Sequence, residues 1–300
     1  MSDDRAVEGA TEAFVACRNL LFTVAYEMLG SAADAEDVLQ ETWLRWVEVD
    51  LAQVRDQRAY LVRITTRQAL NRLRTMARRK ESYVGPWLPE PLLTSPDVAQ
   101  DVELAESVSM AVMLVLETLS PTERAVFVLR EVFDVGYEEI ARAVDKSQAS
   151  VRQIAHRARR HVDARRPRTV VSPSQRQAAL ESFLRALEGE DLQGLLDVLA
   201  PEVVYLSDGG GVKHAAPRPI VGASKVARLM VGGLAKSPIP ITFGPIVVNG
   251  APGLVIYLNG ELDSIVAAHI DEDDRITGLY VVRNPEKLSH IGSEIPLTRR

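Results

Sequence analysis

The chain has 300 residues, of which 46% are hydrophobic and 25% are charged, a composition that excludes wholesale disorder. It has no apolar run long enough to span a membrane, its first residues are acidic and polar, unlike a signal peptide, and its single cysteine, Cys17, excludes internal disulfides and cysteine-based metal clusters. We therefore expect a cytoplasmic protein, and the net charge of −6, taken alone, argues against a nucleic-acid partner.

The charge is arranged in blocks, however. Residues 55–80 carry a net charge of +8, and residues 142–168 carry +7. The rest is acidic, with −8 over 1–54, −10 over 81–141 and −3 over 169–300. Two short, dense basic segments are typical of a protein that binds a polyanion, although one such segment alone is equally compatible with a solvated helix face.

The first part of the chain has helical periodicity, with breaks at Gly30 and over residues 47–57. Ser31 is a natural N-cap for a helix over 32–47. A second helix, over 58–80, has one apolar face, and the adjacent flank is basic. This flank consists of Arg63, Arg67, Asn71, Arg74 and Arg78.

Residues 82–97 contain four prolines and one glycine, so they cannot form the interior of a helix. A passive spacer would be rich in Gly, Ser or charge, whereas this segment contains Trp87, Leu88, Leu92 and Leu93. The composition favours a linker that docks on another part of the protein over a passive spacer.

Helical periodicity returns over residues 98–166. Ser120 and Glu123 have the spacing of a capping box, with Pro121 at the first helical position. Two short helices, over 137–144 and 148–160, have helix-turn-helix spacing. The outward face of the second helix consists of Gln148, Arg152, Gln153, His156, Arg157 and Arg160.

The pattern changes after residues 167–173, where helices are followed by strand-like runs. This order predicts an α+β fold with helices packed on one curved sheet. The expected helices span 175–189, 192–199 and 224–234, and the expected strands span 203–206, 241–248, 253–258, 264–270 and 276–283. The five histidines lack metal-binding spacing, so no metal site is expected. Candidate polar groups for a pocket in this fold are Tyr205, Asp208, His214, Tyr257 and His269.

Three segments, 31–46, 59–74 and 151–162, closely resemble regions 2 and 4 of the extracytoplasmic-function (group 4, sigma-70 family) sigma factors. The chain is also similar to one subgroup, which has a SnoaL-like C-terminal domain and the motifs WLPEPL, DGGG and NPEKL. These motifs stand here at 87–92, 208–211 and 284–288. The subgroup has a lysine directly after the glycines, whereas here Val212 precedes Lys213.

The resemblance implies a multi-domain protein. Two all-α domains, a region 2 bundle and a region 4 helix-turn-helix, would precede an α+β SnoaL-like (nuclear transport factor 2-like) cone domain. The implied boundaries are region 2 over 1–81, a Pro-rich linker over 82–97, region 4 over 98–166, a second linker over 167–174, and the SnoaL-like domain over 175–300.

The implied function is promoter-specific transcription initiation with core RNA polymerase. In region 2, the residues implied to bind polymerase are Asp34, Glu36, Asp37, Gln40, Glu41 and Trp43. The basic flank of the 58–80 helix would contact phosphates at the −10 element, where Asn71 could contact a base, and residues 47–57 would capture an unstacked base.

In region 4, the recognition helix would read the −35 element in the major groove. The expected base contacts come from its N-terminal half and the expected phosphate contacts from the remainder. The expected base readers are Arg152 and Gln153, with Gln148 and Ser150 at the mouth of the groove and His156, Arg157 and Arg160 towards phosphates.

The resemblance also implies that the C-terminal domain regulates activity in cis, with no separate anti-sigma factor, no cofactor and a small-molecule ligand as a further partner. The implied regulatory residues are Trp87, Leu88, Pro89, Glu90, Pro91, Leu92, Asp208, Gly209, Gly210, Gly211, Lys213, Asn284, Pro285, Glu286, Lys287 and Leu288. Two alternatives remain open. One is a SnoaL-type cyclase or isomerase, with Asp208 as its acid–base residue, fused to a DNA-binding module. The other is a plain helix-turn-helix repressor, which leaves residues 31–80 unexplained.

Overall fold

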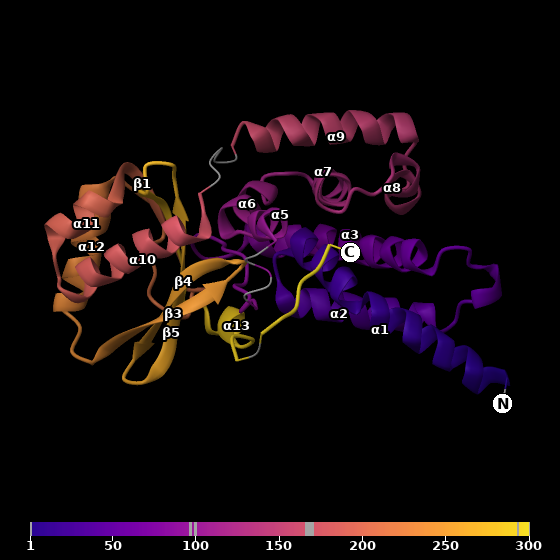
Figure 1. Ribbon diagram of the computed structural model, residues 1–300, viewed down its shortest axis with the longest axis horizontal. Helices are drawn as coiled ribbons and strands as arrows, with labels where there is room; N and C mark the ends of the chain where they lie inside the picture. Colours follow the sequence, from indigo (N-terminus) through magenta and orange to yellow (C-terminus); the bar gives the residue numbers. More distant parts are fainter. Residues whose placement is uncertain (1, 96–97, 99–100, 166–170, 293, 300) are drawn as a thin grey trace. The chain divides into compact units, whose positions relative to one another are not determined.

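The computed structural model describes residues 2–95, 98, 101–165, 171–292 and 294–299 (Figure 1). The chain divides into two compact units. The first unit comprises residues 1–81, 115–166 and 296–300, and the second comprises residues 82–114 and 167–295. In the described part of the chain, no helix is both long enough and apolar enough to cross a membrane.

The first unit begins with a bundle of three helices, α1 (Ser2–Leu29), α2 (Ala32–Trp46) and α3 (Gln57–Glu81), each in contact with the other two. Gly30, at a φ of 69°, ends α1, and the Ser31 side chain caps α2 by accepting a hydrogen bond from the Asp34 amide at 3.1 Å. Trp46 is completely buried, and its Nε1 donates to the Ala10 carbonyl at 2.8 Å.

The second part of this unit contains α7 (Pro121–Phe127), a π-helical turn η2 (Val128–Val132), α8 (Tyr137–Val144) and α9 (Gln148–Asp163). The predicted capping box at the start of α7 is present, because Ser120 and Glu123 exchange hydrogen bonds. Asp145 adopts the left-handed conformation at the end of α8, and Ser147 caps α9. The two helices of the predicted helix-turn-helix therefore form as expected.

The second unit is built on a six-stranded sheet in the order β2-β1-β6-β5-β4-β3. All neighbouring strands are antiparallel except β1 and β6, which are parallel. The strands are β1 (Leu199–Asp208), β2 (Ile220–Val221), β3 (Ile241–Val248), β4 (Ala251–Leu258), β5 (Glu261–Ile270) and β6 (Ile276–Val282).

Three helices, α10 (Pro173–Glu188), α11 (Leu192–Val198) and α12 (Ala223–Ala235), pack against one face of the sheet (Figure 1). Phe183 and Leu195 of these helices share a core with Val266 and Leu279 of the sheet. A last short helix, α13 (Pro285–Leu288), follows β6. We call residues 171–292 the cone domain. Its α+β class confirms the prediction.

The opposite face of the sheet is also apolar, because residues that alternate with the first set, such as Ile265 and Ala267, point to it. Leu88 and Met110 cover it. Helices α5 (Val102–Ser107) and the first part of α6 (Met110–Leu116) therefore lie in the second unit. The resemblance implies region 4 over 98–166, and residues 98–114 of that range pack on the sheet, a contact that helical periodicity alone does not reveal.

Candidate functional site

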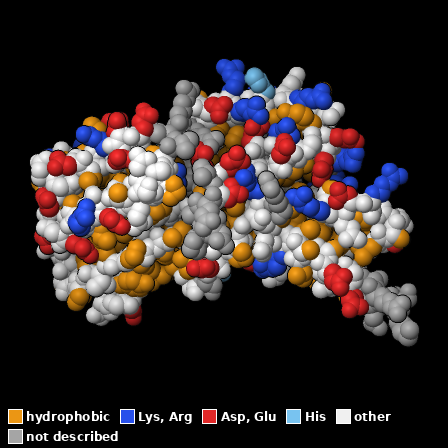
Figure 2. Space-filling model, viewed as in Figure 1, with side chains coloured by type: hydrophobic (Ala, Val, Ile, Leu, Met, Phe, Trp, Pro, Cys, Tyr) orange, Lys and Arg blue, Asp and Glu red, His pale blue; other side chains and the backbone are white. Residues whose placement is uncertain are grey.

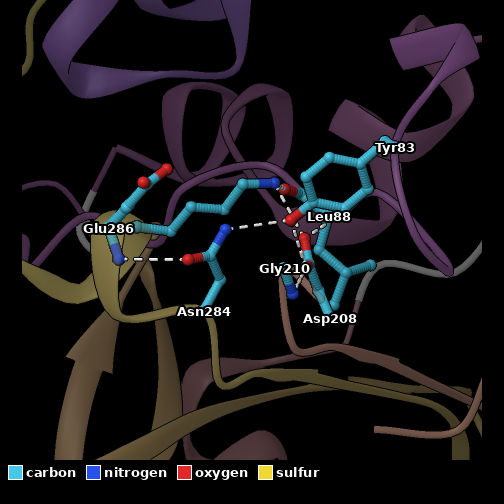
Figure 3. A network of polar contacts seen from close by, with 7 residues as sticks. Tyr83, Leu88, Asp208, Gly210, Asn284 and Glu286 are labelled. Atoms are coloured by element: carbon cyan, nitrogen blue, oxygen red, sulfur yellow. Dashed lines mark hydrogen bonds and ion pairs between the residues drawn. The ribbon is translucent and has the colours of Figure 1, made fainter. Parts of the chain in front are cut away.

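The end of β1 carries a carboxylate, Asp208, that is completely buried. Each of its oxygens accepts two hydrogen bonds (Figure 3). Oδ1 accepts from the Tyr83 hydroxyl at 2.5 Å and the Gly210 amide at 3.0 Å. Oδ2 accepts from Lys287 Nζ at 2.8 Å and the Leu88 amide at 2.9 Å. Donors from three separate segments thus converge on one carboxylate.

The ammonium group of Lys287 is the charge that balances this carboxylate. Its side chain is only 4% exposed, and its Nζ also donates to the Leu88 carbonyl at 2.5 Å. The same atom lies 3.3 Å from the ring centre of Trp87 and 5.0 Å from that of Tyr83. A buried charge needs a counter-charge and hydrogen bonds. Asp208 supplies the counter-charge, and the linker supplies a carbonyl acceptor and two aromatic rings. Lys287 therefore binds the linker as well as Asp208.

Asn284 connects the segment before α13 to the same cluster. Its Nδ2 donates to the Tyr83 hydroxyl at 2.9 Å, and its Oδ1 accepts from the Glu286 amide at 3.0 Å, which caps α13 (Figure 3). Burial, followed by the hydrogen bond to Asp208, raises the pKa of Tyr83 above its ordinary value. Tyr83 therefore remains a neutral phenol that donates to the carboxylate.

The glycines after Asp208 allow the backbone to approach this cluster closely. A Cβ on Gly209 would lie 2.0 Å from the Lys213 carbonyl, and one on Gly210, at a φ of +64°, would lie 2.5 Å from the Asn284 side chain. Gly211 has a φ of +73°, and its Cβ position lies 3.4 Å from the Val84 side chain. Gly209 therefore lets the loop close on itself, while Gly210 allows the close approach of Asn284 and Gly211 lies against Val84 of the linker.

Substituting Gly210 by alanine should weaken linker docking. Gly260→Ala is the matched control, because Gly260 also has a positive φ, of +82°, but has open space around its Cβ position. Both substitutions introduce backbone strain at a positive φ, and only Gly210→Ala also overlaps Asn284. We therefore expect Gly210→Ala to reduce the free energy of linker docking by about 1–3 kcal/mol more than Gly260→Ala does. Native-state hydrogen exchange of the Leu88 amide measures this difference. Equal protection in the two variants would contradict the expectation.

A second contact holds the other end of the linker. The Leu92 amide donates to Asn249 Oδ1 at 3.0 Å, and the Asn249 amide donates to the Leu92 carbonyl at 2.9 Å. The Gly250 amide donates to Thr94 Oγ1 at 2.9 Å. Asn249 and Gly250 form the turn between β3 and β4, and in the sequence they indicated only that turn. Nothing in the sequence indicates separately that these two residues bind the linker.

The structure brings most of the expected regulatory residues together. Residues 88–92 are all buried, and Asp208, the glycines and residues 284–288 surround them as described above. Lys213 is the exception, because its Nζ donates to Asp263 Oδ1 at 2.9 Å. The lysine beside Asp208 is Lys287.

Several of the expected polymerase-binding residues on α2 are engaged within the first unit. Arg72 pairs with Asp34 at 2.6 Å and also with Asp37. The remaining pairs are Arg18 with Glu36, Gln68 with Glu41, and Phe14 with Trp43, while Gln40 is exposed. Leu44, which is not among the residues expected from the sequence, lies on the same helix with 63% of its surface exposed.

The basic flank of α3 is partly covered by α8, which packs on it. Arg67 Nη2 donates to the Arg142 carbonyl at 2.8 Å, and the guanidinium of Arg63 lies 4.4 Å from the ring centre of Tyr60. Asn71 and Arg74 are exposed, whereas the side chain of Arg78 falls outside the described part of the chain. A polar cavity of about 310 Å³ is lined by residues 53–56 and by side chains of α3 and α8.

Helix α9 presents its basic face to solvent (Figure 2). Its apolar stripe is buried except for Ile154, which is half-buried. Arg152 lies 5.5 Å from the ring centre of Tyr137, and Arg157 lies 3.8 Å from Glu123, so these two side chains have neighbours on α8 and α7. The exposed residues on this face are Gln148, Arg152, Gln153, His156, Arg157 and Arg160, with Ser150 half-buried.

A buried arginine joins the two halves of the first unit, and the sequence analysis did not detect it. Arg124 of α7 is 2% exposed. Its Nε donates to the Glu27 carbonyl at the end of α1 at 3.0 Å, and its Nη1 donates to Glu117 Oε1 at 2.6 Å. Arginine is rarely buried unless it is paired, so this contact marks a specific junction between the helix-turn-helix half and the three-helix bundle.

The cone domain contains a partly open cavity of about 460 Å³ between the sheet and the helices. Of the polar residues expected there, Tyr205 and His214 line it, whereas Asp208, Tyr257 and His269 do not. Asp208 is turned toward the linker, and His269 lines a separate cavity of about 40 Å³. The expectation that Asp208 could act as an acid–base residue in this cavity is wrong, because its carboxylate is occupied by the linker and Lys287.

The carboxylate that does line the cavity is Asp263. Arg283 donates to both of its oxygens at 3.0 Å. Burial opposes its ionisation, but the hydrogen bonds from Arg283 and Lys213 outweigh burial and lower the pKa of Asp263. Among the described residues, no group of three or more His, Cys, Asp or Glu side chains is placed to hold a metal ion.

Comparison with known proteins gives two family matches. Residues 13–79 match sigma-70 region 2, and residues 109–162 match sigma-70 region 4. The chain is 34% identical to the ECF RNA polymerase sigma factor SigJ of Mycobacterium tuberculosis H37Rv over 92% of each chain, and 30% identical to the probable ECF sigma factor SigI of M. tuberculosis CDC 1551 over 94% of this chain and 96% of SigI. The crystal structure of M. tuberculosis SigJ superposes with a TM-score of 0.74 at 31% identity, covering 93% of this chain and 98% of that one.

Proposed function

The chain belongs to the extracytoplasmic-function sigma factors, and on that premise we propose how its faces are used and how it is controlled. A sigma factor of this family directs RNA polymerase to promoters. The exposed face of α9 reads the −35 element, the flank of α3 contacts the −10 element, and the exposed side of α2, including Leu44, binds core polymerase. The site of action is the cytoplasm, where promoter DNA and polymerase are found.

The roles on DNA can be separated by promoter sequence. Arg152→Ala should relax the preference at one −35 position by about 1–3 kcal/mol, because a side chain in the N-terminal half of a recognition helix contacts base edges. Arg74→Ala should weaken all promoters alike and reduce the salt dependence of binding, because a phosphate contact carries no sequence information. Run-off transcription on a promoter library measures both effects. The reverse pattern would overturn these assignments.

Activity is controlled in cis by docking of the linker, residues 82–95, on the cone domain. The observation that carries this proposal is the buried pair of Lys287 and Asp208, since both groups are also bonded to the backbone of Leu88. A charged pair at this depth is stable only while the linker is in place. The chain therefore contains both the regulatory domain and its target, and no separate anti-sigma factor is required.

The test compares the intact chain with a variant whose linker cannot dock. Run-off transcription with core polymerase should differ between wild type and Lys287→Met. Truncation of the chain after residue 171 is a less specific test. It would uncover Leu88, Leu92 and Met110, and it would also remove Thr298, whose amide donates a hydrogen bond to Thr23 of α1. Unchanged transcription with a released linker would refute cis control.

The cone domain acts as a binding module and not as an enzyme. An isomerase of this kind needs a carboxylate whose pKa lies near neutrality so that it can remove and return a proton. Here Asp263 is paired with two cations and its pKa is lowered, and Asp208 is closed off by the linker. Turnover of a carbonyl substrate that is lost in Asp263→Asn would favour the enzyme instead.

A further inference from the structure

We propose that the cavity of the cone domain binds a small amphipathic carboxylate, with its apolar body between α12 and the sheet and its acid group at Arg283. Only the expected effect of this binding on the linker rests on the proposed cis control. The binding itself is independent of that control and can be measured separately.

The apolar character of the ligand follows from the walls of the cavity. The volume of about 460 Å³ lies within the range of pockets that hold drug-sized molecules. Leu229, Met230 and Leu234 of α12 line one side, and Phe243 and Ile256 of the sheet line the other. Leu229, which lines the cavity, has 42% of its surface exposed, so an apolar ligand could cover it.

The acidic group of the ligand follows from the charges. The charged side chains that line the cavity are Lys236, Asp263 and Arg283, and Lys213 pairs with Asp263 from outside the lining. Three cations thus accompany one carboxylate, so the cavity favours an anion. Three N–H groups of Arg283 are bonded to Asp263 and to the His214 carbonyl, out of the five that a guanidinium offers.

The hydroxyl of Tyr205 adds a donor on the same cavity. Burial raises the pKa of Tyr205 and outweighs the opposite effect of its hydrogen bond with Ser207, so the phenol stays protonated and has a proton to donate to a carboxylate oxygen. An Arg and a neutral Tyr together suit a planar acid group better than an alcohol, which could accept a bond but would leave the cationic excess unbalanced.

Two sets of backbone hydrogen bonds connect the Arg283 site to the residues that hold the linker. The amides of Arg283 and Asn284 both donate to the Asp208 carbonyl, at 2.7 and 2.9 Å. The Lys213 amide donates to the Gly209 carbonyl at 2.9 Å. A ligand carboxylate that competes with Asp263 for Arg283 and Lys213 therefore disturbs both segments that carry partners of Asp208. Linker release and ligand binding should favour each other, because coupling between sites is reciprocal.

The experiment uses the full chain and 9-anthracenecarboxylate as a fluorescent probe, with 9-anthracenemethanol as the neutral compound of the same ring system. Fluorescence titration should give at least ten-fold tighter binding of the acid than of the alcohol. Met230→Trp, which fills the cavity, should abolish binding of both compounds. Arg283→Lys should weaken the acid by at least ten-fold and leave the alcohol unchanged.

Equal affinity for the acid and the alcohol, or binding of the acid that survives Met230→Trp, would overturn the proposal. The coupling has its own readout, since Lys287→Met should bind the acid more tightly than wild type. If the acid binds as expected but equally well to Lys287→Met, the link to the linker is refuted. Transcription by Lys287→Met in the absence of any ligand tests cis control separately, so failure of one inference does not imply failure of the other.

Discussion

Replacement of Lys287 by methionine should release the linker from the cone domain. The substitution keeps most of the apolar volume but leaves the Asp208 carboxylate completely buried without its counter-charge. Loss of one partner of a buried ion pair costs about 3–5 kcal/mol. Part of that cost is relieved if the linker opens and water reaches the carboxylate. Hydrogen-exchange protection of the Leu88 amide should therefore fall by about two orders of magnitude or more.

The same variant should increase transcription. In the docked form residues 82–95 are held on the cone domain, which leaves little free chain between α3 and α7. A longer free linker lets region 2 and region 4 reach two separate promoter elements over a wider range of distances. Run-off transcription with core polymerase on a promoter with both elements measures the increase.

Two further variants serve as controls for Lys287→Met. Lys225→Met removes an exposed lysine from α12 and should leave both linker protection and transcription unchanged. The double variant Asp208→Asn/Lys287→Met removes both charges and should recover part of the lost protection, because no buried charge then remains unpaired. Full protection of Leu88 in Lys287→Met would show that the ion pair does not hold the linker.

The local elements could be predicted because their signals lie within a few residues. Ser31 and Ser120 have cap spacing, and each side chain accepts the expected backbone hydrogen bond. The helix-turn-helix over α8 and α9 likewise follows from apolar periodicity and a short turn. The docking of WLPEPL was expected for two reasons. The linker contains large apolar side chains that are unfavourable in water, and the family resemblance implies the same contact.

The partners of the buried charges could not be predicted, because they depend on contacts between distant residues. Asp208 was a candidate to line the cavity. The direction in which its side chain faces depends on the register of β1 with β6, which pairs residues that are distant in the sequence. Lys213 was expected near the glycines, and its side chain instead reaches Asp263 of β5. Arg124 has no distinguishing signal in the sequence, because nothing near it indicates that the Glu27 carbonyl would accept its hydrogen bond.

Substitution of Arg124 by methionine should have opposite effects on stability and on DNA binding. The guanidinium bonds the end of α1 and Glu117, so its loss removes a buried pair and leaves the Glu27 carbonyl without this donor. We expect the free energy of unfolding of the first unit to fall by about 3–5 kcal/mol. Promoter binding by the holoenzyme should rise, because α8 must leave the flank of α3 before Arg67 can contact DNA.

The opposite signs make this prediction specific. A variant that merely damages the fold lowers both stability and binding, as expected for Phe127→Ala in the buried face of the same helix. Arg130→Met is the arginine control. The Arg130 side chain is partly exposed, at 28%, and pairs with the exposed Asp134 and the Val135 carbonyl, so its loss should cost less than the loss of the buried Arg124. We call the form with α8 packed on the flank of α3 closed and the form with this flank free open. Only the open form binds DNA, so the apparent affinity is the intrinsic affinity multiplied by the open fraction. The increase in DNA affinity in Arg124→Met therefore cannot exceed the reciprocal of the open fraction in wild type. A fall in both quantities would show that the packing of region 4 on region 2 supports DNA binding, and that the closed form is not an inhibited one.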